Sequence, residues 1–466
     1  MKHYGNSVSE IKIAYLGGGS RGWAWHFMSD LTSCDDISGD VWLYDIDMEA
    51  AKNNEIIGEK YKNAEGAKSM WNYHAARSIE EALTAADFVI ISILPGTFDE
   101  MESDVHAPEK YGIWQSVGDT SGPGGIIRAM RTIPMFEGFA EKIRQCCPKA
   151  WVINYTNPMT QCVKALYRVF PEIRAFGCCH EVFGTQKLLK AVVENLLGAE
   201  NVDRRDIKVN PVGVNHFTWL TSAYYKNVDL FPLYREFWKQ HPDGFSKEGV
   251  SLDSNWANTS QSAENVKKDL FERFGWIAAA GDRHLVEFCP GKWYLESPER
   301  VEQMRFGLTT VSWRKDGLKT RLERGARLVS GEEEVVIKNS GEEGVQQIRA
   351  LLGLIDLVTN VNIPNVGQIP NLPMGAVVET NAVFRANSLV PVMAGAIPKE
   401  IYPLISRICA EQELVAEGIA KRDTELIFNA FSTDPLVTCS LADARKLFCE
   451  MFDNTKAWLT MYQPLK

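Results

Sequence analysis

The fold of this chain is decided by one stretch near its N-terminus, Ile11-Lys12-Ile13-Ala14-Tyr15-Leu16-Gly17-Gly18-Gly19-Ser20-Arg21-Gly22. Its first half has the apolar character of a buried strand, and the glycines follow without a break. Residues 23–31 then have a helical pattern, and Asp45 closes the next expected strand, 23 residues beyond Gly22. A glycine-rich turn between a strand and a helix is typical of a dinucleotide-binding α/β unit.

Each part of this turn has a chemical task in such a unit. Gly17 allows the tight turn, Gly19 lets the backbone approach a pyrophosphate, and Gly22 lets the helix pack closely. The helix N-terminus stabilises the negative charge. Asp45 would accept hydrogen bonds from the adenosine ribose, which favours NAD over its 2′-phosphorylated form. The expected cofactor residues are therefore Gly17, Gly19, Ser20, Gly22 and Asp45; a plain glycine turn beside a solvated aspartate is the alternative.

Alternating strand and helix patterns continue to about residue 200. Residues 88–94 and 151–155 are almost continuous apolar runs, as in strands that are buried on both faces of a parallel sheet. Beyond about residue 205 the pattern changes to strand-like, aromatic-rich and long helical segments. We therefore expect a Rossmann-like, doubly wound α/β domain over residues 1–205 and an α+β domain over residues 206–466.

Two segments of the second half have distinctive patterns. A stripe of apolar residues predicts a helix within residues 344–359, at Val345, Ile348, Leu351, Leu352 and Ile355. Residues 314–344 are dense in alternating charges, which predicts a solvated helix and loop. No proline- or serine-rich linker separates the two halves, so we expect them to pack intimately.

The composition excludes several classes of function. The chain has 466 residues, and its 60 acidic against 50 basic residues give a net charge of −10. This balance provides no basic surface for nucleic acid or anionic lipid. No apolar run approaches the roughly 18 residues of a membrane span, and the start of the chain lacks the apolar core of a signal peptide. Ten cysteines without a CxxC pair indicate reduced thiols. We expect a cytoplasmic protein with neither nucleic-acid nor membrane partners.

Residues 154–159, NYTNPM, directly follow an expected buried strand. They therefore lie at the carboxyl edge of the sheet, where α/β proteins bind ligands. Pro158 keeps Asn157 out of helical geometry and would hold its amide toward the crevice. An Asx-turn that merely ends the strand is an equally good interpretation.

Residues 177–182, GCCHEV, and residues 214–219, VNHFTW, supply Cys179 and His216. Cysteine and histidine are both good ligands for a divalent transition metal, and two protein ligands would leave positions open for a substrate. Buried thiols and a hydrogen-bonded core histidine are the alternative, which the spacing alone favours.

Two further blocks combine glycine with charged residues. Residues 118–125, GDTSGPGG, precede an expected helix. So many glycines before a helix indicate backbone that lies close to a ligand or forms a mobile flap. Residues 281–288, GDRHLVEF, place three titratable groups in sequence beside apolar flanks. A capped surface loop and a salt-bridged corner are the respective alternatives.

Taken together and in this order, these segments resemble those of glycoside hydrolase family 4, whose members are NAD- and metal-dependent glycosidases. The resemblance covers nearly the whole chain and includes residues 365–373, NVGQIPNLP, with Val378-Glu379. It implies a fold shared with lactate and malate dehydrogenases. The block Cys179-His180-Glu181-Val182 looks like the CHEV block of the α-galacturonidase branch, distinct from the CHS-type block of α-glucosidases and α-galactosidases. The resemblance thus implies a uronic-acid substrate from short oligosaccharides.

The resemblance also implies a redox-assisted elimination, which is an exception to the two-carboxylate mechanism of most glycosidases. NAD⁺ would take a hydride from C3 of the sugar, a base would remove the C2 proton, and the aglycone would leave from C1. Water would then add, and the retained NADH would reduce C3 again. NAD⁺ is therefore needed but not consumed.

The same resemblance assigns roles to individual residues. Cys179 and His216 would bind Mn²⁺ or a similar ion, which acts as a Lewis acid on the sugar 2- and 3-oxygens. Asn157 would bind sugar hydroxyls near the metal, and Asp119 would lie near the nicotinamide and the substrate. These four residues outline the expected site.

Asp282 is the candidate base for the C2 proton, again by resemblance. His180 is a candidate proton donor or sugar-binding residue, and Glu181, which distinguishes the block, is expected at the sugar. A uronate also needs a cation, and arginine offers a planar fork that matches a carboxylate. Arg283, the neighbour of the candidate base, is the first choice, followed by Arg128 and Arg131.

Two other functions stay open on the sequence. One is an α-galactosidase or α-glucosidase of the same family. The other is a plain NAD-dependent hydroxyacid dehydrogenase, which would release NADH stoichiometrically and need no metal. We also expect a homo-oligomer, either a dimer or a tetramer.

Overall fold

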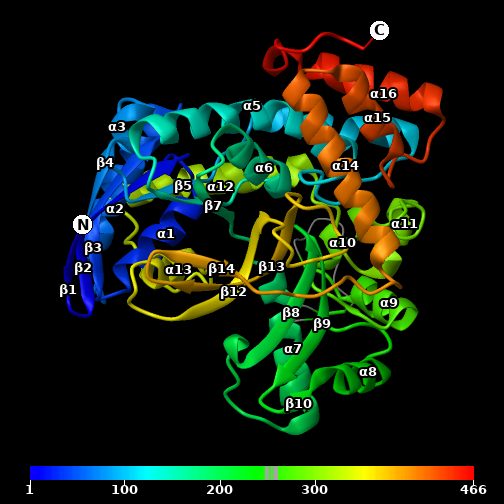
Figure 1. Ribbon diagram of the computed structural model, residues 1–466, viewed down its shortest axis with the longest axis horizontal. Helices are drawn as coiled ribbons and strands as arrows, with labels where there is room; N and C mark the ends of the chain where they lie inside the picture. The colour runs from blue at the N-terminus through cyan, green and yellow to red at the C-terminus, as the bar shows by residue number, and fades with distance from the viewer. Residues whose placement is uncertain (247–250, 253–255, 257–260, 466) are drawn as a thin grey trace.

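The computed structural model describes residues 1–246, 251–252, 256 and 261–465. Its largest element is a mixed ten-stranded sheet (Figure 1). The strands are β1 (Lys2–Tyr4), β2 (Ser7–Leu16), β3 (Ile37–Tyr44), β4 (Trp71–Ala75), β5 (Phe88–Ile91), β6 (Trp151–Asn154), β7 (Arg174–Gly177), β12 (Leu357–Pro364), β13 (Val377–Arg385) and β14 (Ser388–Pro391). Their order is β14-β13-β12-β7-β6-β5-β2-β3-β4, with β1 beside β2. The neighbours from β7 to β4 are parallel, which confirms the predicted doubly wound fold.

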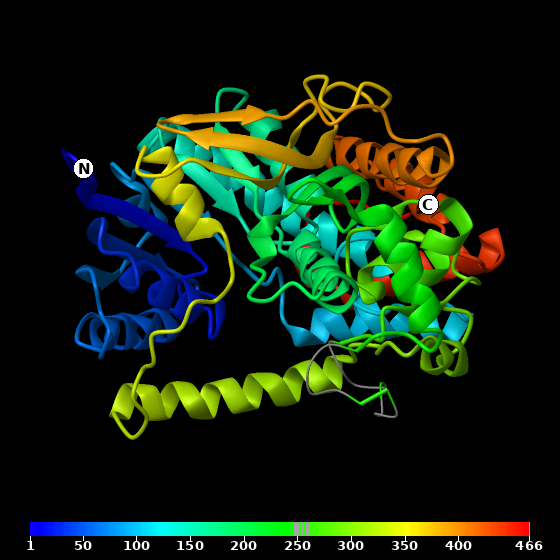
Figure 2. The ribbon, with the colours of Figure 1, turned by 90° about the horizontal axis from the view of Figure 1, so that it is seen from below.

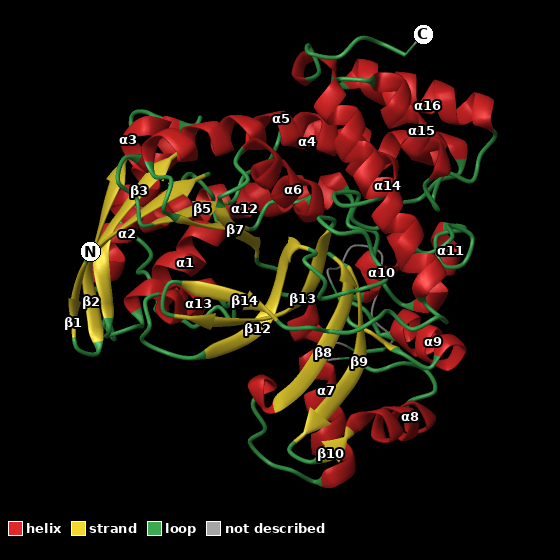
Figure 3. Ribbon diagram, in the orientation of Figure 1, coloured by secondary structure: helices red, strands yellow, loops and turns green. Residues whose placement is uncertain are grey.

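The alternation of side chains along β2 explains why helices cover both faces of this sheet (Figure 3). Ile13 and Tyr15 belong to the apolar core on one face, which is completed by α1 (Trp23–Thr32), α2 (Met48–Lys62) and α13 (Gly344–Leu351). Ala14 and Leu16 belong to the core on the other face, which is completed by α3 (Ile79–Leu83), α5 (Gly122–Cys146) and α6 (Met159–Val169). The helix α4 (Phe98–His106) follows β5 and packs on α5.

The second half of the chain adds a smaller antiparallel sheet and further helices, in agreement with the predicted α+β part. The sheet contains β8 (Ile207–Val214), β9 (Phe217–Tyr225), β10 (Val228–Asp229) and β11 (Ile277–Ala278), and it packs against α7 (Glu181–Leu197) and α8 (Leu230–Gln240). Next follow α9 (Asn265–Phe274), α10 (Asp282–Phe288) and α11 (Pro298–Met304). The last helices pack against α5 (Figure 1) and are α14 (Tyr402–Lys421), α15 (Thr424–Thr433) and α16 (Leu441–Asn454). Short 3₁₀ helices span Ala107–Tyr111, Arg204–Asp206 and Lys456–Trp458.

The two halves of the chain share the large sheet. β12 of the second half pairs with β7 of the first, where Asn362 lies opposite Gly177. β13 and β14 then continue the sheet beyond β12. The sequence predicted that the two halves pack intimately, because no linker separates them. The structure agrees, since strands of both halves pair within one sheet.

Two predictions for the second half have different outcomes. The helix predicted within residues 344–359 is too long, because α13 ends at Leu351 and β12 begins at Leu357. Gly353 between them has φ 81°, a left-handed conformation that ends helices. The solvated helix predicted after residue 314 is confirmed as α12 (Val311–Ser330), in which the buried residues are Val311 and Leu328. Figure 2 shows α12 running along one side of the molecule. Among the helices of the described residues, none has the length and apolar character that crossing a bilayer requires.

Candidate active site

The glycine turn connects β2 to α1 at the carboxyl edge of the large sheet. Close contacts with neighbouring atoms leave no room for a side chain at its first glycines. A Cβ atom on Gly17 would lie 2.0 Å from the carbonyl oxygen of Ser92, and one on Gly19 would lie 2.7 Å from the Cβ atom of Ala50. Close helix packing was the expected reason for glycine at position 22, but the space beside Gly22 is nearly open. Its φ of 150°, which other residues rarely adopt, is the constraint instead.

The open end of the turn offers N–H groups and one carboxylate. Gly22 is the N-cap residue of α1, and no side chain caps this helix. Asp45 accepts hydrogen bonds from the backbone N–H groups of Gly19 (2.8 Å) and Asp47 (2.9 Å), which hold its carboxylate beside the turn. An uncapped helix N-terminus next to a fixed carboxylate fits a dinucleotide, with the pyrophosphate at the helix and the ribose at Asp45.

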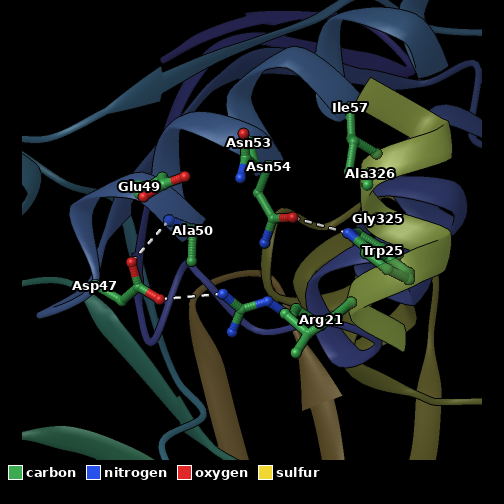
Figure 4. A pocket seen from close by; sticks show the side chains of 11 residues that line it. Arg21, Trp25, Asp47, Glu49, Ala50, Asn53, Asn54, Ile57, Gly325 and Ala326 are labelled. Carbon is green, nitrogen blue, oxygen red and sulfur yellow. Dashed lines mark hydrogen bonds and ion pairs between the residues drawn. The ribbon is translucent and has the colours of Figure 1, made fainter. Parts of the chain in front are cut away.

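Asn54 on α2 supports the turn from its other side, next to a cavity of about 240 Å³ between α1, α2 and α12 (Figure 4). Its amide nitrogen donates to the carbonyl oxygens of Gly18 (2.7 Å) and Ser20 (3.0 Å). Its amide oxygen accepts a hydrogen bond from the indole N–H of Trp25 (2.8 Å). The conformation at Ser20 is thus fixed by both neighbouring helices.

Asn157 lies in the segment that follows β6. The sequence offered two interpretations of this segment, an Asx-turn and a ligand-facing amide, and the structure shows the first at Asn154 and supports the second at Asn157. Asn154 forms the Asx-turn, since its Oδ1 atom accepts from the N–H of Thr156 (2.9 Å). Asn157 instead turns its amide nitrogen toward Asp119 Oδ2 (3.4 Å), and its backbone carbonyl accepts from Arg128 Nε (3.1 Å). The buried Oδ1 atom of Asn157 has no partner among the described residues, so it is available to a ligand hydroxyl.

The loop before α5 carries Asp119 and Thr120 to His216. The Thr120 hydroxyl lies 2.7 Å from Asp119 Oδ1 and 3.0 Å from His216 Nδ1. A hydroxyl has one proton, which the carboxylate accepts, so the Thr120 oxygen must accept from Nδ1–H of His216. The Nε2 atom of His216 therefore keeps its lone pair for a metal.

Glu287 on α10 fixes this loop. Its Oε1 atom accepts from the backbone N–H groups of Val117 (2.7 Å) and Gly118 (2.9 Å). Burial raises the pKa of Glu287 to about 8. Burial would also raise the pKa of Asp119, but Arg128 and the two histidines His284 and His216 hold it below its usual value. Asp119 is thus a carboxylate that faces the guanidinium group of Arg128.

His216 occupies the two-residue hairpin turn between β8 and β9, with φ 64°. The preceding Asn215 interacts with the thiol of Cys179, the residue that lies between β7 and α7. The turn thus places Asn215 against Cys179 and His216 against Thr120. The predicted metal ligands come from separate elements that this hairpin connects.

Cys179 is buried close to two carboxyl groups, those of Glu379 and Glu181. Its burial, together with the carboxylates of Glu379 and Glu181, raises the pKa of its thiol well above the usual value. Burial also raises the pKa of Glu379 to about 7, although it accepts hydrogen bonds from Asn360 (2.7 Å) and Asn215 (3.3 Å). A metal ligand must be a thiolate, and a divalent ion would compensate these negative groups. The donor set therefore fits a metal.

The structure adds His284 to the predicted His216, but the predicted ligand Cys179 is not in the group of candidate metal ligands that the described residues form. Ligand atoms of Asp119, His216 and His284 lie within 4.8 Å of one another, and the two imidazole rings are 3.8 Å apart. Burial and the neighbouring His284 lower the pKa of His216 to about 3, and burial also lowers the pKa of His284. Both rings are therefore neutral and able to bind a cation. The signal for His284 was its place in the GDRH block, beside Arg283.

Asp282 from the same block does not join that group. Its two oxygens accept from the backbone N–H groups of Val266 (3.1 Å) and Lys267 (3.2 Å), at the start of α9. The Lys267–Glu264 ion pair is adjacent, and burial followed by the charge of Glu264 raises the pKa of Asp282. These contacts show an anchor between α9 and α10.

His180 and Glu181 lie at the start of α7, and both face other site elements. The His180 ring stacks on Trp23 of α1 at 5.9 Å, and its Nδ1 atom lies 3.2 Å from Glu342 Oε1. Burial would lower the pKa of His180, but Glu342 and Glu181 raise it to about 9. The Oε2 atom of Glu181 accepts from the N–H of Gly281 (2.7 Å), which connects α7 to the GDRH block.

The three candidate arginines have different partners. Arg131 forms a fully buried ion pair with Asp104, so its charge is already compensated. Arg128 binds the carbonyl of Asn157 and faces Asp119. Arg283 donates to Thr309. Arg128 and Arg283 therefore remain as cations that could face a substrate.

Two family models match this chain. The model described as family 4 glycosyl hydrolase matches residues 12–195, and the one for the family 4 C-terminal domain matches residues 211–437. An alpha-galacturonidase from Thermoanaerobacterium saccharolyticum is 59% identical over 461 residues, 98% of each chain. One from Bacillus subtilis is 51% identical over 448 residues, 96% of this chain and 98% of the relative. An alpha-galactosidase from Bacillus subtilis is 25% identical over 456 residues, 97% of this chain and 100% of the relative.

Solved structures agree with these matches. The crystal structure of a Bacillus subtilis protein named lplD has a TM-score of 0.90 and 51% identity, covering 95% of this chain and 100% of that one. A 6-phospho-alpha-glucosidase from gut microorganisms, in complex with NAD and Mn²⁺, has a TM-score of 0.79 and 20% identity, covering 98% and 100%. The second likeness shows that the fold is shared.

Proposed function

The chain belongs to family 4 of the glycosyl hydrolases, and we propose that within it the protein is an α-galacturonidase that acts on short oligosaccharides. The observation that carries this proposal is the difference in identity between relatives. Those named alpha-galacturonidase are at least twice as identical to this chain as the alpha-galactosidase. The Glu181 carboxylate, which distinguishes the CHEV block, lies among site residues and supports it.

We propose NAD⁺ and a divalent ion such as Mn²⁺ as cofactors. When bound, they would exchange a hydride with sugar C3 and polarise the sugar oxygens. The glycine turn and the uncapped N-terminus of α1 would hold the pyrophosphate, and Asp45 would bind the ribose. Two observations support NAD⁺: no side chain caps the N-terminus of α1, and the Asp45 carboxylate is held beside the turn by the N–H of Gly19.

Cys179 and His216 are the proposed metal ligands, with Asp119 and His284 next to His216. Thr120 accepts from Nδ1–H of His216, which would leave the lone pair of Nε2 for the ion. Asn157 would bind a sugar hydroxyl through the Oδ1 atom that lacks a partner among the described residues. The chain's own side chains thus orient the sugar.

Two proton transfers remain for the protein. His180, which Glu342 and Glu181 keep protonated, is the proposed donor or sugar-binding group. Asp282 is the proposed base for the C2 proton, on the resemblance to the family. His284 is the alternative that the contacts support, because its buried Nδ1 atom has no partner in the described part of the chain.

The test is the release of nitrophenol from α-D-galacturonide and α-D-galactoside substrates, with and without NAD⁺, Mn²⁺ and thiol. We expect the galacturonide to be the better substrate, and only in the presence of both cofactors. Faster release from the galactoside would replace the proposed substrate by the runner-up of the same family.

Location and assembly are further parts of the proposal. All ten cysteines are free, which supports the reducing cytoplasm. A homo-oligomer of two or four copies is expected, and light scattering of the purified protein would give its mass.

A further inference from the structure

Two arginines from distant parts of the chain meet at Thr309. Arg283 on α10 donates from Nη1 to the hydroxyl oxygen of Thr309. Arg314 on α12 donates from Nε to the backbone carbonyl of the same residue (3.4 Å) and from Nη2 to the carbonyl of Val117 (2.9 Å). Thr309 is buried, whereas both arginines keep partial exposure. Both guanidinium groups thus contact the same residue, one at its hydroxyl and the other at its carbonyl.

This arrangement has an electrostatic cost. Like charges held close together destabilise each other unless anions offset them. Carboxyl groups near the pair are those of Asp119 and Glu287, with Glu181 also near Arg283. An anionic ligand between the two arginines would add to this compensation.

The carboxylates that face the pair are already engaged elsewhere. Asp119 is bound by Thr120 and Asn157. Glu287 accepts from two backbone N–H groups, and Glu181 accepts from another. Within the part of the chain that the structure describes, none of the three forms an ion pair with either arginine.

The pair keeps donors for a ligand. Among the described residues, Arg283 uses only Nη1 and Arg314 uses Nε and Nη2, so Nε and Nη2 of Arg283 and Nη1 of Arg314 have no partner. Arginine N–H groups match a carboxylate in a bidentate manner. Arg314 donates to Val117, two residues before Asp119, so the pair lies beside the loop that carries this candidate substrate-binding residue.

Arg314 also differs from the other cations of α12. Arg324 and Arg327 pair with Glu333, and Lys315 pairs with Asp99. Arg314 instead contacts the loop that carries Asp119.

We propose that Arg283 and Arg314 together bind the carboxylate of the uronic acid and so select it against the neutral sugar. The proposal rests on the proposed galacturonidase function and adds a residue from α12 to its site. A neutral galactoside would bring no anion to the pair, which disfavours its binding.

The experiment compares nitrophenyl α-D-galacturonide with its methyl ester, an uncharged analogue of nearly the same shape. In Arg314→Gln we expect the ratio of kcat/KM for acid over ester to fall about tenfold to hundredfold, the value of one charge-assisted hydrogen bond. Arg283→Gln should act in the same direction. Arg327→Gln, on the exposed part of α12, is the matched control and should keep the wild-type ratio.

A purely structural role would give a different result. If Arg314→Gln only disturbed the loop at Val117, acid and ester would lose activity equally and the ratio would stay unchanged, which would overturn the proposal. Binding of NAD⁺ and Mn²⁺ to each variant, measured directly, shows whether the rest of the site is intact. A wild-type enzyme that does not prefer the acid would instead contradict the proposed substrate, so the two failures are distinguishable.

Discussion

The glycine turn and the metal-ligand group differ in the groups that they offer to a ligand: backbone groups of one segment in the turn, and side chains of several segments in the metal-ligand group. The turn is made of consecutive residues. The N–H groups of Gly17, Gly18 and Gly19 already donate to Tyr44 and Asp45, so its proposed ligand groups are those of the uncapped start of α1. The metal-ligand group is made of side chains from separate segments. Ligand atoms of Asp119, His216 and His284 lie together, Asn157 contacts Asp119, and the proposed ligand Cys179 contacts Asn215, the neighbour of His216. A larger side chain in the glycine turn should therefore weaken NAD⁺ binding, and loss of a side-chain group from the metal-ligand group should weaken metal binding.

The largest effect is expected at Cys179. Cys179→Ser should abolish metal-dependent activity, because a hard hydroxyl replaces a thiolate poorly as a ligand. Cys178→Ser should be tolerated, since Cys178 is buried in the core beneath the sheet. Measurements of Mn²⁺ binding and nitrophenol release would check both variants. A sensitive Cys178 beside a tolerant Cys179 would place the metal site one residue earlier.

The second effect concerns the two α10 residues that are candidates for the base. Loss of the base should reduce kcat by about 10² to 10⁴ and stop exchange of deuterium from C2 of the substrate, without loss of NAD⁺ binding. Asp282→Asn and His284→Asn separate the two possibilities. If Asp282→Asn lowers only the melting temperature and exchange continues, Asp282 is the anchor of α9 that its contacts show.

A smaller effect is expected at Thr120, which contacts no ion itself. Thr120→Val removes the hydroxyl that orients His216 but keeps the shape, so the Mn²⁺ affinity should fall about tenfold to hundredfold. Thr120→Ser should restore it. Titration with Mn²⁺, followed by electron paramagnetic resonance, measures the change, and an unchanged affinity in Thr120→Val would exclude the orienting role.

The smallest effect is expected where only backbone strain is added. Gly22→Ala introduces a side chain at φ 150° with nearly open space beside it, at a cost of about 1–3 kcal/mol. The NAD⁺ affinity should fall while Mn²⁺ affinity stays constant. Gly138→Ala is the matched control, because nothing lies near its Cβ position; equal behaviour of the two variants would contradict the strain argument.

The two regions also differ in how far the sequence predicts them. Residues 11–22 show their pattern locally, because strand, turn and helix are neighbours in the chain, and the predicted turn agrees with the structure. Asn54 of α2 supports the turn from outside the segment. The helix predicted within residues 344–359 was too long, since apolar spacing alone did not reveal that Gly353 ends it and that residues 357–364 join the sheet.

The side-chain group depends on tertiary contacts that spacing does not contain. Motifs identified Asn157, Cys179 and His216 as candidates, but the partners of Asp282 on α9 were not visible in the sequence. Thr120 stood in a glycine-rich loop without a distinguishing pattern. Arg314 was one of many charges in a solvated helix, and only the packing of α12 shows its contact with the Asp119 loop.

The most direct test of a NAD-dependent glycosidase is whether NAD⁺ is used without being consumed. The enzyme would be given an α-galacturonide with a catalytic amount of NAD⁺ and Mn²⁺, and galacturonic acid and NADH would be measured together over many turnovers. We predict steady release of galacturonic acid with no net accumulation of NADH. Formation of NADH in proportion to the substrate consumed would contradict it and would identify a dehydrogenase on the same fold.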